Sequence, residues 1–179
     1  NNLKFSTFKR TVIGGSACPP AMIRTLEDDF GVQVIHAWGM TELSPLGTLA
    51  KLKGKHLDLP PQAQRRLLEK QGKVIYGIDM QITGDDGQAL PWDGQASGNL
   101  VVRGPWVIRS YFKREGSPLQ DGWFPTGDVA TIDPDGFMQI TDRSKDVIKS
   151  GGEWISSIDL ENIAMAHPAV HEAAAIACR

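Results

Sequence analysis

A strand–helix–strand pattern near the start of the chain restricts its possible folds more than any other feature. Residues 11–13 form a β-branched run, and residues 32–36 predict a second strand. The segment between them predicts a helix whose apolar side chains share one face, namely Met22, Ile23, Leu26 and Phe30. Because the links are short, the pattern predicts a βαβ unit with parallel strands and a right-handed crossover. The expected fold class is α/β.

The loops that follow the two strands, residues 14–16 and 37–42, are expected at the same edge of the sheet. Open α/β sheets bind their ligands at this carboxyl edge. Gly14-Gly15 is also typical of a simple tight turn. Thr41 beside Glu42 suits a phosphate with its Mg²⁺, but the same pair suits a helix N-terminus equally well. The residues alone leave both interpretations open.

The chain up to residue 142 then contains one more predicted helix, followed mainly by strands. Residues 43–59 lack periodicity and are expected to form a loop, and residues 62–71 predict a helix that ends at Gly72. The strands predicted after this helix are residues 73–83, 98–103, 129–132 and 137–141, of which the last two form a hairpin around a Pro-Asp-Gly turn.

Asp128 precedes the hairpin and follows Gly127. The glycine allows the backbone to approach a ligand closely, and a carboxylate can accept hydrogen bonds from two vicinal hydroxyls. The alternative interpretation is an aspartate that only serves a turn.

Three cations, Arg143, Lys145 and Lys149, stand close together between the hairpin and a further helix. Such a cluster either faces solvent or binds an anion. The helix is predicted from Ser156 and Asp159, which resemble a capping box, and from Pro168, which prevents its continuation. Its apolar face is expected at Leu160, Ile163 and Ala164, and residues 170–178 predict a strand.

Composition excludes several classes of protein. Of the 179 residues, 41% are hydrophobic and 22% charged, which is ordinary for a globular protein with a real core. The net charge of −2 argues against a general nucleic-acid surface. Cys18 and Cys178 have no metal-site spacing and imply no disulfide framework. The sequence has no apolar run of membrane length, so a soluble, cytoplasmic protein is expected.

Four segments together resemble the adenylate-forming superfamily, which includes acyl-CoA synthetases, luciferases and peptide-synthetase adenylation domains. They are residues 14–19, 38–42, 126–128 and 142–155, in the family's order. Residues 149–155 look most like bacterial medium- and long-chain fatty acyl-CoA synthetases. The resemblance implies that residues 1–142 are the C-terminal part of the large domain, with the βαβ unit and a β-rich subdomain. Residues 143–179 would be the hinge and the start of a small α+β domain.

The family's reaction uses ATP, Mg²⁺ and CoA. A carboxylate attacks the α-phosphate of ATP to give an acyl-adenylate and pyrophosphate, and the CoA thiolate then displaces AMP. By resemblance, Thr41 would contact the α-phosphate, Glu42 would hold Mg²⁺, and Lys145 would be the hinge residue. Together with Lys149, these are the expected catalytic residues.

The resemblance also implies the binding residues. Those expected around ATP and the adenylate are Gly15, Ser16, His36, Ala37, Trp38, Gly39, Thr41, Asp128, Arg143, Lys145, Lys149 and Trp154. Among these, Asp128 would take the ribose hydroxyls with Arg143 nearby. The CoA side would be formed by Gly151, Gly152 and Trp154.

The chain departs from the family in four respects. Trp38 stands where Tyr or Phe is usual, and Asn99 replaces a common Glu, which puts any role of position 99 in doubt. The family's phosphate loop and its C-terminal catalytic lysine have no counterpart in the chain, so the chain itself is expected to be an inactive fragment. Two alternatives remain: another adenylate-forming enzyme, such as an aryl-CoA ligase or peptide-synthetase adenylation domain, or a non-catalytic nucleotide-binding module. Small molecules are the expected partners, with no nucleic acid, and homo-oligomerisation of the parent is left open.

Overall fold

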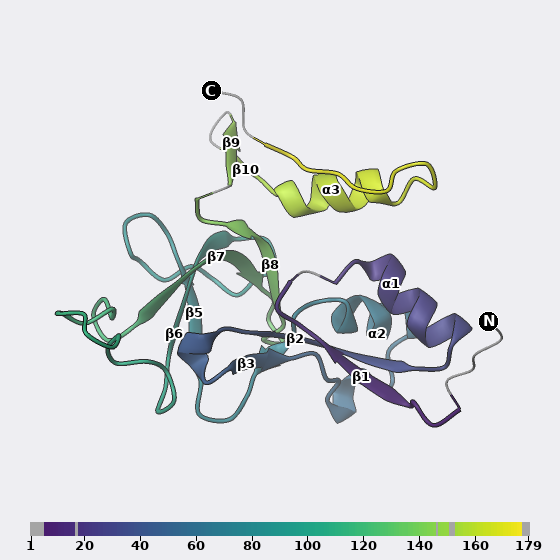
Figure 1. Cartoon of the computed structure of the whole chain (residues 1–179), viewed down its shortest axis with the longest axis horizontal. Helices are drawn as coiled ribbons and strands as arrows, with labels where there is room; N and C mark the ends of the chain where they lie inside the picture. Colours follow the sequence, from purple (N-terminus) through teal and green to yellow (C-terminus); the bar gives the residue numbers. More distant parts are fainter. Residues whose placement is uncertain (1–5, 17, 146, 151–152, 177–179) are drawn as a thin grey trace.

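The computed structural model describes residues 6–16, 18–145, 147–150 and 153–176. It is a mixed α/β structure whose described strands form two four-stranded sheets and one two-stranded sheet (Figure 1). The strands are β1 Arg10–Ile13, β2 Gln33–Gly39, β3 Leu46–Leu49, β4 Lys73–Val74, β5 Asp79–Thr83, β6 Ser97–Arg103, β7 Phe124–Ile132, β8 Met138–Arg143, β9 Ile148–Ser150 and β10 Glu153–Ile155. The α-helices are α1 Pro20–Arg24, α2 Pro61–Leu68 and α3 Ser157–Met165.

The first sheet has the order β1-β2-β3-β4 and contains the predicted βαβ unit. Strands β1 and β2 are parallel, with Arg10 opposite Gln33 and Ile13 opposite His36. The helical segment between them starts at α1, with a proline in its first turn, and continues as a π-helical turn, Thr25–Asp29. The prediction of a parallel pair joined by a helix is therefore confirmed.

The predicted apolar face of this helix is only partly correct. Ile23 is buried against Cys18 and Val34, but Met22 and Phe30 are exposed. Leu26 still packs partly against this cluster, whereas the π-helical turn Thr25–Asp29 changes the angular spacing of the side chains and leaves Phe30 off the face of Ile23.

Two segments predicted as loops contain strand. Ala37–Gly39 continue β2 and pair with β3, and β3 itself lies within residues 43–59. Helix α2 ends at Leu68, earlier than predicted. The predicted strand at residues 73–83 is divided between β4 in the first sheet and β5 in another. Gly77, with φ +84°, lies in the turn between them.

The second four-stranded sheet has the order β5-β6-β7-β8, with every pair antiparallel. The hairpin predicted around residues 133–136 is confirmed as β7–β8. The carboxylate of Asp133 accepts from the backbone amides of Asp135 and Phe137, at 2.9 and 3.0 Å, which fixes the turn.

The main core joins this sheet to the end of β2. Trp38 from β2 and Leu43 from the following 3-10 turn, Thr41–Leu43, pack with buried side chains of the second sheet. Those side chains include Met80, Ile82, Leu100, Val102, Ala130, Ile132 and Met138. The junction of the two sheets therefore places the end of β2 beside β7 and β8.

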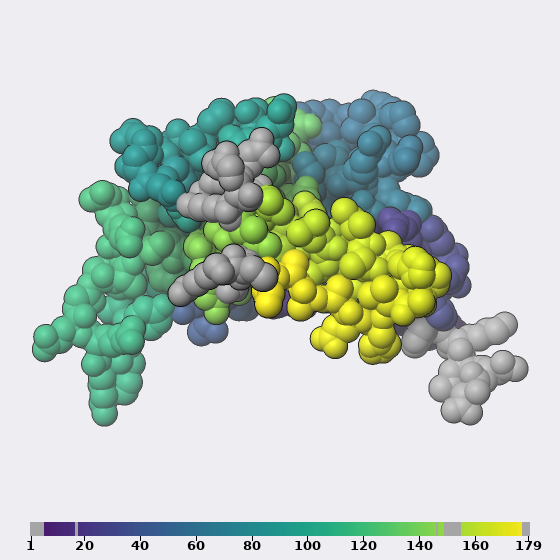
Figure 2. Space-filling model, turned by 90° about the horizontal axis from the view of Figure 1, so that it is seen from above, coloured from purple at the N-terminus to yellow at the C-terminus, as the bar shows by residue number. Residues whose placement is uncertain are grey.

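The segment after β8 contains the β9–β10 hairpin and α3 (Figure 1). The Ser156 side chain caps α3 by accepting from the Asp159 amide at 3.1 Å, as predicted. Leu160 and Ile163 of its predicted apolar face are exposed. Residues 170–176 form no strand, so that part of the prediction is wrong, and residues 177 and 178 lie outside the described residues. In Figure 2 the segment lies across the middle of one face of the molecule.

No helix in the described part of the chain combines the length and the apolar content needed to span a membrane.

Candidate functional site

A hollow of about 130 Å³ opens where the end of β2 meets the β7–β8 hairpin. It brings together side chains from segments far apart in the sequence. The predicted site residues that line it are Gly15, Ser16, Ala37, Trp38, Gly39, Asp128 and Arg143. The loop after β1 and the end of β2 thus meet at one edge of the first sheet, as the βαβ pattern predicts.

Asp128 is held in this hollow through both of its carboxylate oxygens. It lies within β7, directly opposite Arg143 of β8, and only 3% of it is exposed. Its Oδ1 is 3.0 Å from Nη1 of Arg143, and its Oδ2 accepts a hydrogen bond of 2.9 Å from Nε1 of Trp38. The turn interpretation of Asp128 is wrong, because strand pairing holds its backbone while the side chain binds two donors.

Burial raises the pKa of Asp128, and the neighbouring Arg143 and the Trp38 indole work in the opposite direction. Each oxygen of an ionised carboxylate has two acceptor positions. With one donor on each oxygen, the charged form keeps acceptor capacity on both sides. This carboxylate is therefore suited to accept from two adjacent hydroxyls.

A second hollow of about 290 Å³ adjoins the first. The two share Gly15 and residues 37–40, so the end of β2 is their common wall. Thr41 lines only the second hollow, together with the apolar side chains of Val12, Pro45 and Leu46. The site thus has a polar part at Asp128 and a more apolar part beside Thr41.

Thr41 is the first residue of the 3-10 turn, and the N-cap position belongs to Met40, with no side-chain capping hydrogen bond. The interpretation of Thr41 as a helix cap is therefore wrong. Its side chain is exposed beside the second hollow and can approach a ligand there.

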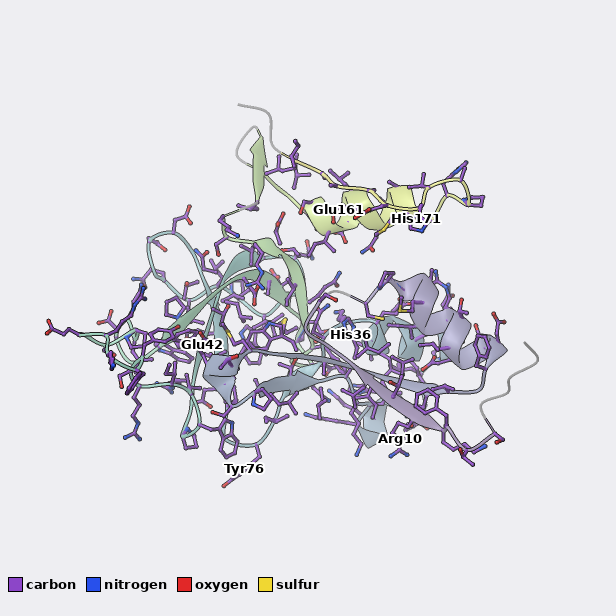
Figure 3. The ribbon with its side chains drawn as sticks, in the orientation of Figure 1. Arg10, His36, Glu42, Tyr76, Glu161 and His171 are labelled. Atoms are coloured by element: carbon purple, nitrogen blue, oxygen red, sulfur yellow. The ribbon has the colours of Figure 1, made fainter. Side chains whose placement is uncertain are left out.

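Glu42 is half-buried and held by the loop that follows β6. The Tyr111 hydroxyl donates to its Oε1 at 2.9 Å, and the Ile108 amide donates to its backbone carbonyl at 2.8 Å. The hydrogen bond to Glu42 raises the pKa of Tyr111, because it stabilises the protonated phenol. Figure 3 shows Glu42 on the side of the second four-stranded sheet and His36 on the side of the helices.

The residues around Glu42 fit a magnesium ion that is bound mainly by substrate. Within the described residues, no group of three or more His, Cys, Asp or Glu side chains could hold a metal ion. Mg²⁺ is commonly bound through one or two carboxylates, substrate phosphates and water. Among the described side chains, Tyr111 donates a hydrogen bond to the Glu42 carboxylate.

His36 lines neither hollow. It is buried, and its Nδ1 lies 2.8 Å from the carbonyl of Glu69. Its Nε2 has no partner among the described residues. Burial lowers the pKa of His36, so the neutral ring is favoured in the core.

The predicted residues after β8 are only partly described. Lys145 is exposed in the turn that follows β8 and lines neither hollow. The backbones of Lys149 and Trp154 pair with each other in the β9–β10 hairpin, but their side chains lie outside the description. Gly151 and Gly152 lie outside the described residues altogether.

Sequence reasoning missed two polar residues of the hollow, Gln71 and Asp142. Gln71 Oε1 accepts from the Ile140 amide at 2.8 Å, an interaction that nothing local in the sequence indicates. Asp142 is buried and accepts from the amides of Arg143 and Ser157, at 2.7 and 3.0 Å. The position of Asp142 next to Arg143 in the charged stretch of the sequence could have indicated that it belongs to the hollow.

Asn99, which departs from the family's usual residue, lies on β6 and contacts the segment after β8. Its Oδ1 accepts from the Ser144 hydroxyl at 3.1 Å. The departure therefore still gives a polar contact beside the predicted hinge.

Known proteins with similar sequences include several CoA ligases. The 3-methylmercaptopropionyl-CoA ligase of Ruegeria lacuscaerulensis is 57% identical over 97% of this chain and 32% of its own length. The medium-chain-fatty-acid–CoA ligase of Ectopseudomonas oleovorans is 56% identical over 100% of the chain and 33% of its own length. The chain thus spans about a third of these relatives.

A solved structure of a CoA synthetase is also similar to this chain. The o-succinylbenzoate-CoA synthetase of Bacillus subtilis, in complex with its acyl-adenylate intermediate, superposes with a TM-score of 0.75 at 32% identity. The match covers 92% of this chain and 32% of that one. Residues 2–112 match the model of the AMP-binding enzyme family. The chain therefore belongs to the AMP-binding enzyme family.

Proposed function

We propose that this chain is part of an ATP-dependent acyl-CoA ligase that activates an aliphatic carboxylic acid. In the first step the acid's carboxylate attacks the α-phosphate of ATP and pyrophosphate leaves. In the second step the CoA thiolate attacks the acyl carbon and AMP leaves. The observation that carries the proposal is the buried Asp128 carboxylate, held by Arg143 and Trp38 at the junction of the glycine loop and β2.

The nucleotide is proposed to lie along the end of β2. Asp128 would accept from the two ribose hydroxyls, with the adenine against Gly15 and residues 37–39, whereas the buried His36 would lie behind them. Thr41, which lines the adjoining hollow, would then contact the α-phosphate. Glu42 would hold a Mg²⁺ ion, which would supply positive charge against the phosphates during adenylation.

The acyl chain is proposed to be medium or long and aliphatic rather than aromatic. The hollow beside Thr41 has an apolar lining from Val12, Pro45 and Leu46, which suits an alkyl chain next to the reacting phosphate. The two relatives at 56–57% identity are named for aliphatic acids. The cytoplasm is the proposed compartment, where the free thiol of Cys18 suits a reducing environment.

The segment from residue 143 is proposed to be the hinge and the start of a second domain. Lys145, Lys149 and Trp154 would approach the adenylate, and Gly151 and Gly152 with Trp154 would form the CoA side. The contacts that join α3 to β8 include Ser156 Oγ to the Thr141 carbonyl at 2.6 Å and the Ser157 amide to Asp142. A domain rotation about this segment would have to break these two hydrogen bonds.

The hinge is tested by Lys145→Pro in the full-length ligase, with Lys145→Ala as the control for the lost charge. Proline fixes φ near −65° and also restrains Ser144. Pyrophosphate release should change by less than about tenfold, whereas thioester formation from supplied acyl-adenylate should slow much more. Equal effects of both variants on both half-reactions would make Lys145 an anion contact without a hinge role.

The proposed function is tested by ATP–pyrophosphate exchange in the full-length ligase, with linear acids of several lengths and benzoate as competing substrates. Exchange should depend on an aliphatic acid, and added CoA should give the thioester. The 179-residue chain alone is expected to form no thioester. Exchange with none of the acids would refute the proposal, and preference for benzoate would favour an aryl-CoA ligase.

A further inference from the structure

We propose that Trp38 is a positioning residue for the ribose-binding carboxylate. Its indole N–H holds the Asp128 carboxylate in the orientation that recognises two vicinal hydroxyls. The inference rests on the proposed nucleotide site, but it assigns to Trp38 a role that differs from stacking on the base.

The two donors that hold Asp128 differ in how firmly they are placed. The side chain of Arg143 is 57% exposed, so it retains freedom to move into solvent. Trp38 is only 7% exposed and donates to Asp128 Oδ2 within the protein interior. A buried hydrogen bond to a carboxylate is stronger than the same bond at the surface. The indole is therefore the fixed anchor of this carboxylate.

Trp38 itself is held by its packing on β3. A Cβ atom built on Gly47 would lie 2.5 Å from Cζ3 and 2.6 Å from Cε3 of the indole, so the ring rests directly on the glycine backbone. Trp38 also pairs with Thr48 in the β2–β3 register and belongs to the main core. These contacts restrict the rotation of the ring and aim its N–H at β7.

The backbone of Asp128 is fixed as well. Its amide donates to the Thr126 hydroxyl at 3.1 Å, and that hydroxyl donates to the Leu100 carbonyl at 2.9 Å. With the backbone held, the remaining freedom of Asp128 is rotation of its side chain. The Trp38 hydrogen bond opposes this rotation, because turning the carboxylate away would leave a buried N–H without a partner.

This arrangement has a consequence for recognition. Each carboxylate oxygen already binds one donor and keeps one acceptor position for a hydroxyl. A carboxylate fixed in this way distinguishes a complete ribose from a deoxyribose. If Trp38 no longer donated, the side chain could rotate to retain one good hydrogen bond, and the distinction would weaken.

The test measures binding without turnover. Dissociation constants of ATP, 2′-deoxy-ATP and 3′-deoxy-ATP are determined by calorimetry for the full-length ligase, in the absence of acid and CoA. Wild type should prefer ATP over both deoxy analogues. Trp38→Phe, which keeps an aromatic ring and removes the donor, should reduce this preference by about tenfold, the usual effect of losing one hydrogen bond to a charged group.

Two further variants separate positioning from packing. Trp38→Phe/Asp128→Ala should show the same preference as Asp128→Ala alone, because the indole acts through that carboxylate. Trp92→Phe is the matched control, since Trp92 is outside both hollows. This variant should prefer ATP over the deoxy analogues as strongly as wild type does.

If Trp38→Phe does not fold, an isosteric 3-benzothienylalanine at position 38 replaces it, because this side chain keeps the volume and lacks only the N–H. Equal weakening of ATP and both analogues, with the preference unchanged, would overturn the proposal and leave Trp38 a packing residue. A wild type that binds none of the three nucleotides would instead refute the proposed function.

Discussion

Asp128 and Glu42 are the two carboxylates that we propose to bind ATP and its Mg²⁺, and the protein holds them by different means. Asp128 lies inside a strand and binds a donor on each oxygen, one from β2 and one from β8. Glu42 lies in a short 3-10 turn, is half-buried, and binds Tyr111 through one oxygen. The first carboxylate is built into the junction of two sheets, whereas the second is supported by a loop.

The difference corresponds to the two ligands we propose for them. A ribose presents its two hydroxyls at a fixed spacing, so a fully constrained acceptor recognises it best. Mg²⁺ usually keeps several waters and is bound through only one or two carboxylates together with substrate phosphates, so a single carboxylate supported by a loop would be enough to hold it. The region of Asp128 should therefore control binding of the nucleotide, and the region of Glu42 should control the adenylation step.

The largest effect is expected for Glu42→Gln, which keeps the shape and removes the charge. In the full-length ligase, adenylation should slow by about a hundredfold, because one group that neutralises the developing charge is lost. Thioester formation from supplied acyl-adenylate should change much less. Pyrophosphate release and thioester formation are measured separately, and an equal loss in both would mean that Glu42 only supports the fold.

Asp128→Ala should have the next largest effect, and it should act on binding. Loss of charge-assisted hydrogen bonds costs about 1.5–3 kcal/mol, so the KM for ATP should rise by roughly ten- to a hundredfold. The KM for the fatty acid serves as the internal control and should stay nearly constant. Similar increases in both constants would remove the contrast between the two carboxylates.

A smaller effect is expected for Tyr111→Phe, which removes the hydroxyl that orients Glu42. Loss of a residue that orients a metal ligand typically lowers the affinity for the metal ten- to a hundredfold. The half-saturating Mg²⁺ concentration should therefore rise by about tenfold. The measurement is Mg²⁺-dependent pyrophosphate exchange at saturating ATP, and free-enzyme Mn²⁺–ATP binding provides a second readout. Unchanged metal dependence would assign the Tyr111 contact to the stability of the loop alone.

The smallest effect is expected from pH. Burial raises the pKa of Asp128, so this carboxyl should take up its proton at a higher pH than an ordinary aspartate does. A protonated carboxyl has less acceptor capacity, and affinity for adenosine should fall on acidification through this raised value. Adenosine is used because it has no phosphate to titrate. The Asp128→Asn variant should bind adenosine weakly, with little dependence on pH. If its affinity for adenosine depended on pH as strongly as that of wild type, Asp128 would be excluded as the source of the pH dependence.

The elements that the sequence predicted correctly are those with a local signal. The β7–β8 hairpin follows from its Pro-Asp-Gly turn, and the α3 cap follows from Ser156. Strand β3 escaped prediction because it is short and contains Gly47, and its pairing with β2 and β4 is not local. Residues 170–176 are apolar enough for a strand but pair with no strand in the described part of the chain. A strand needs its partner as well as its own propensity.

For the candidate site, too, part could be predicted from the sequence and part depended on the tertiary structure. Residue chemistry alone left Asp128, Arg143 and the glycine loop with two interpretations each, and the order of the motifs, through their resemblance to the adenylate-forming superfamily, predicted them as site residues. Nothing local indicated that Trp38, 90 positions away, donates to Asp128, or that Tyr111 donates to Glu42. Those partners are decided by how the two sheets pack, since burial determines which donor is left facing which acceptor. The sequence alone therefore predicted which groups belong to the candidate site, and the tertiary structure decided which of them hold one another.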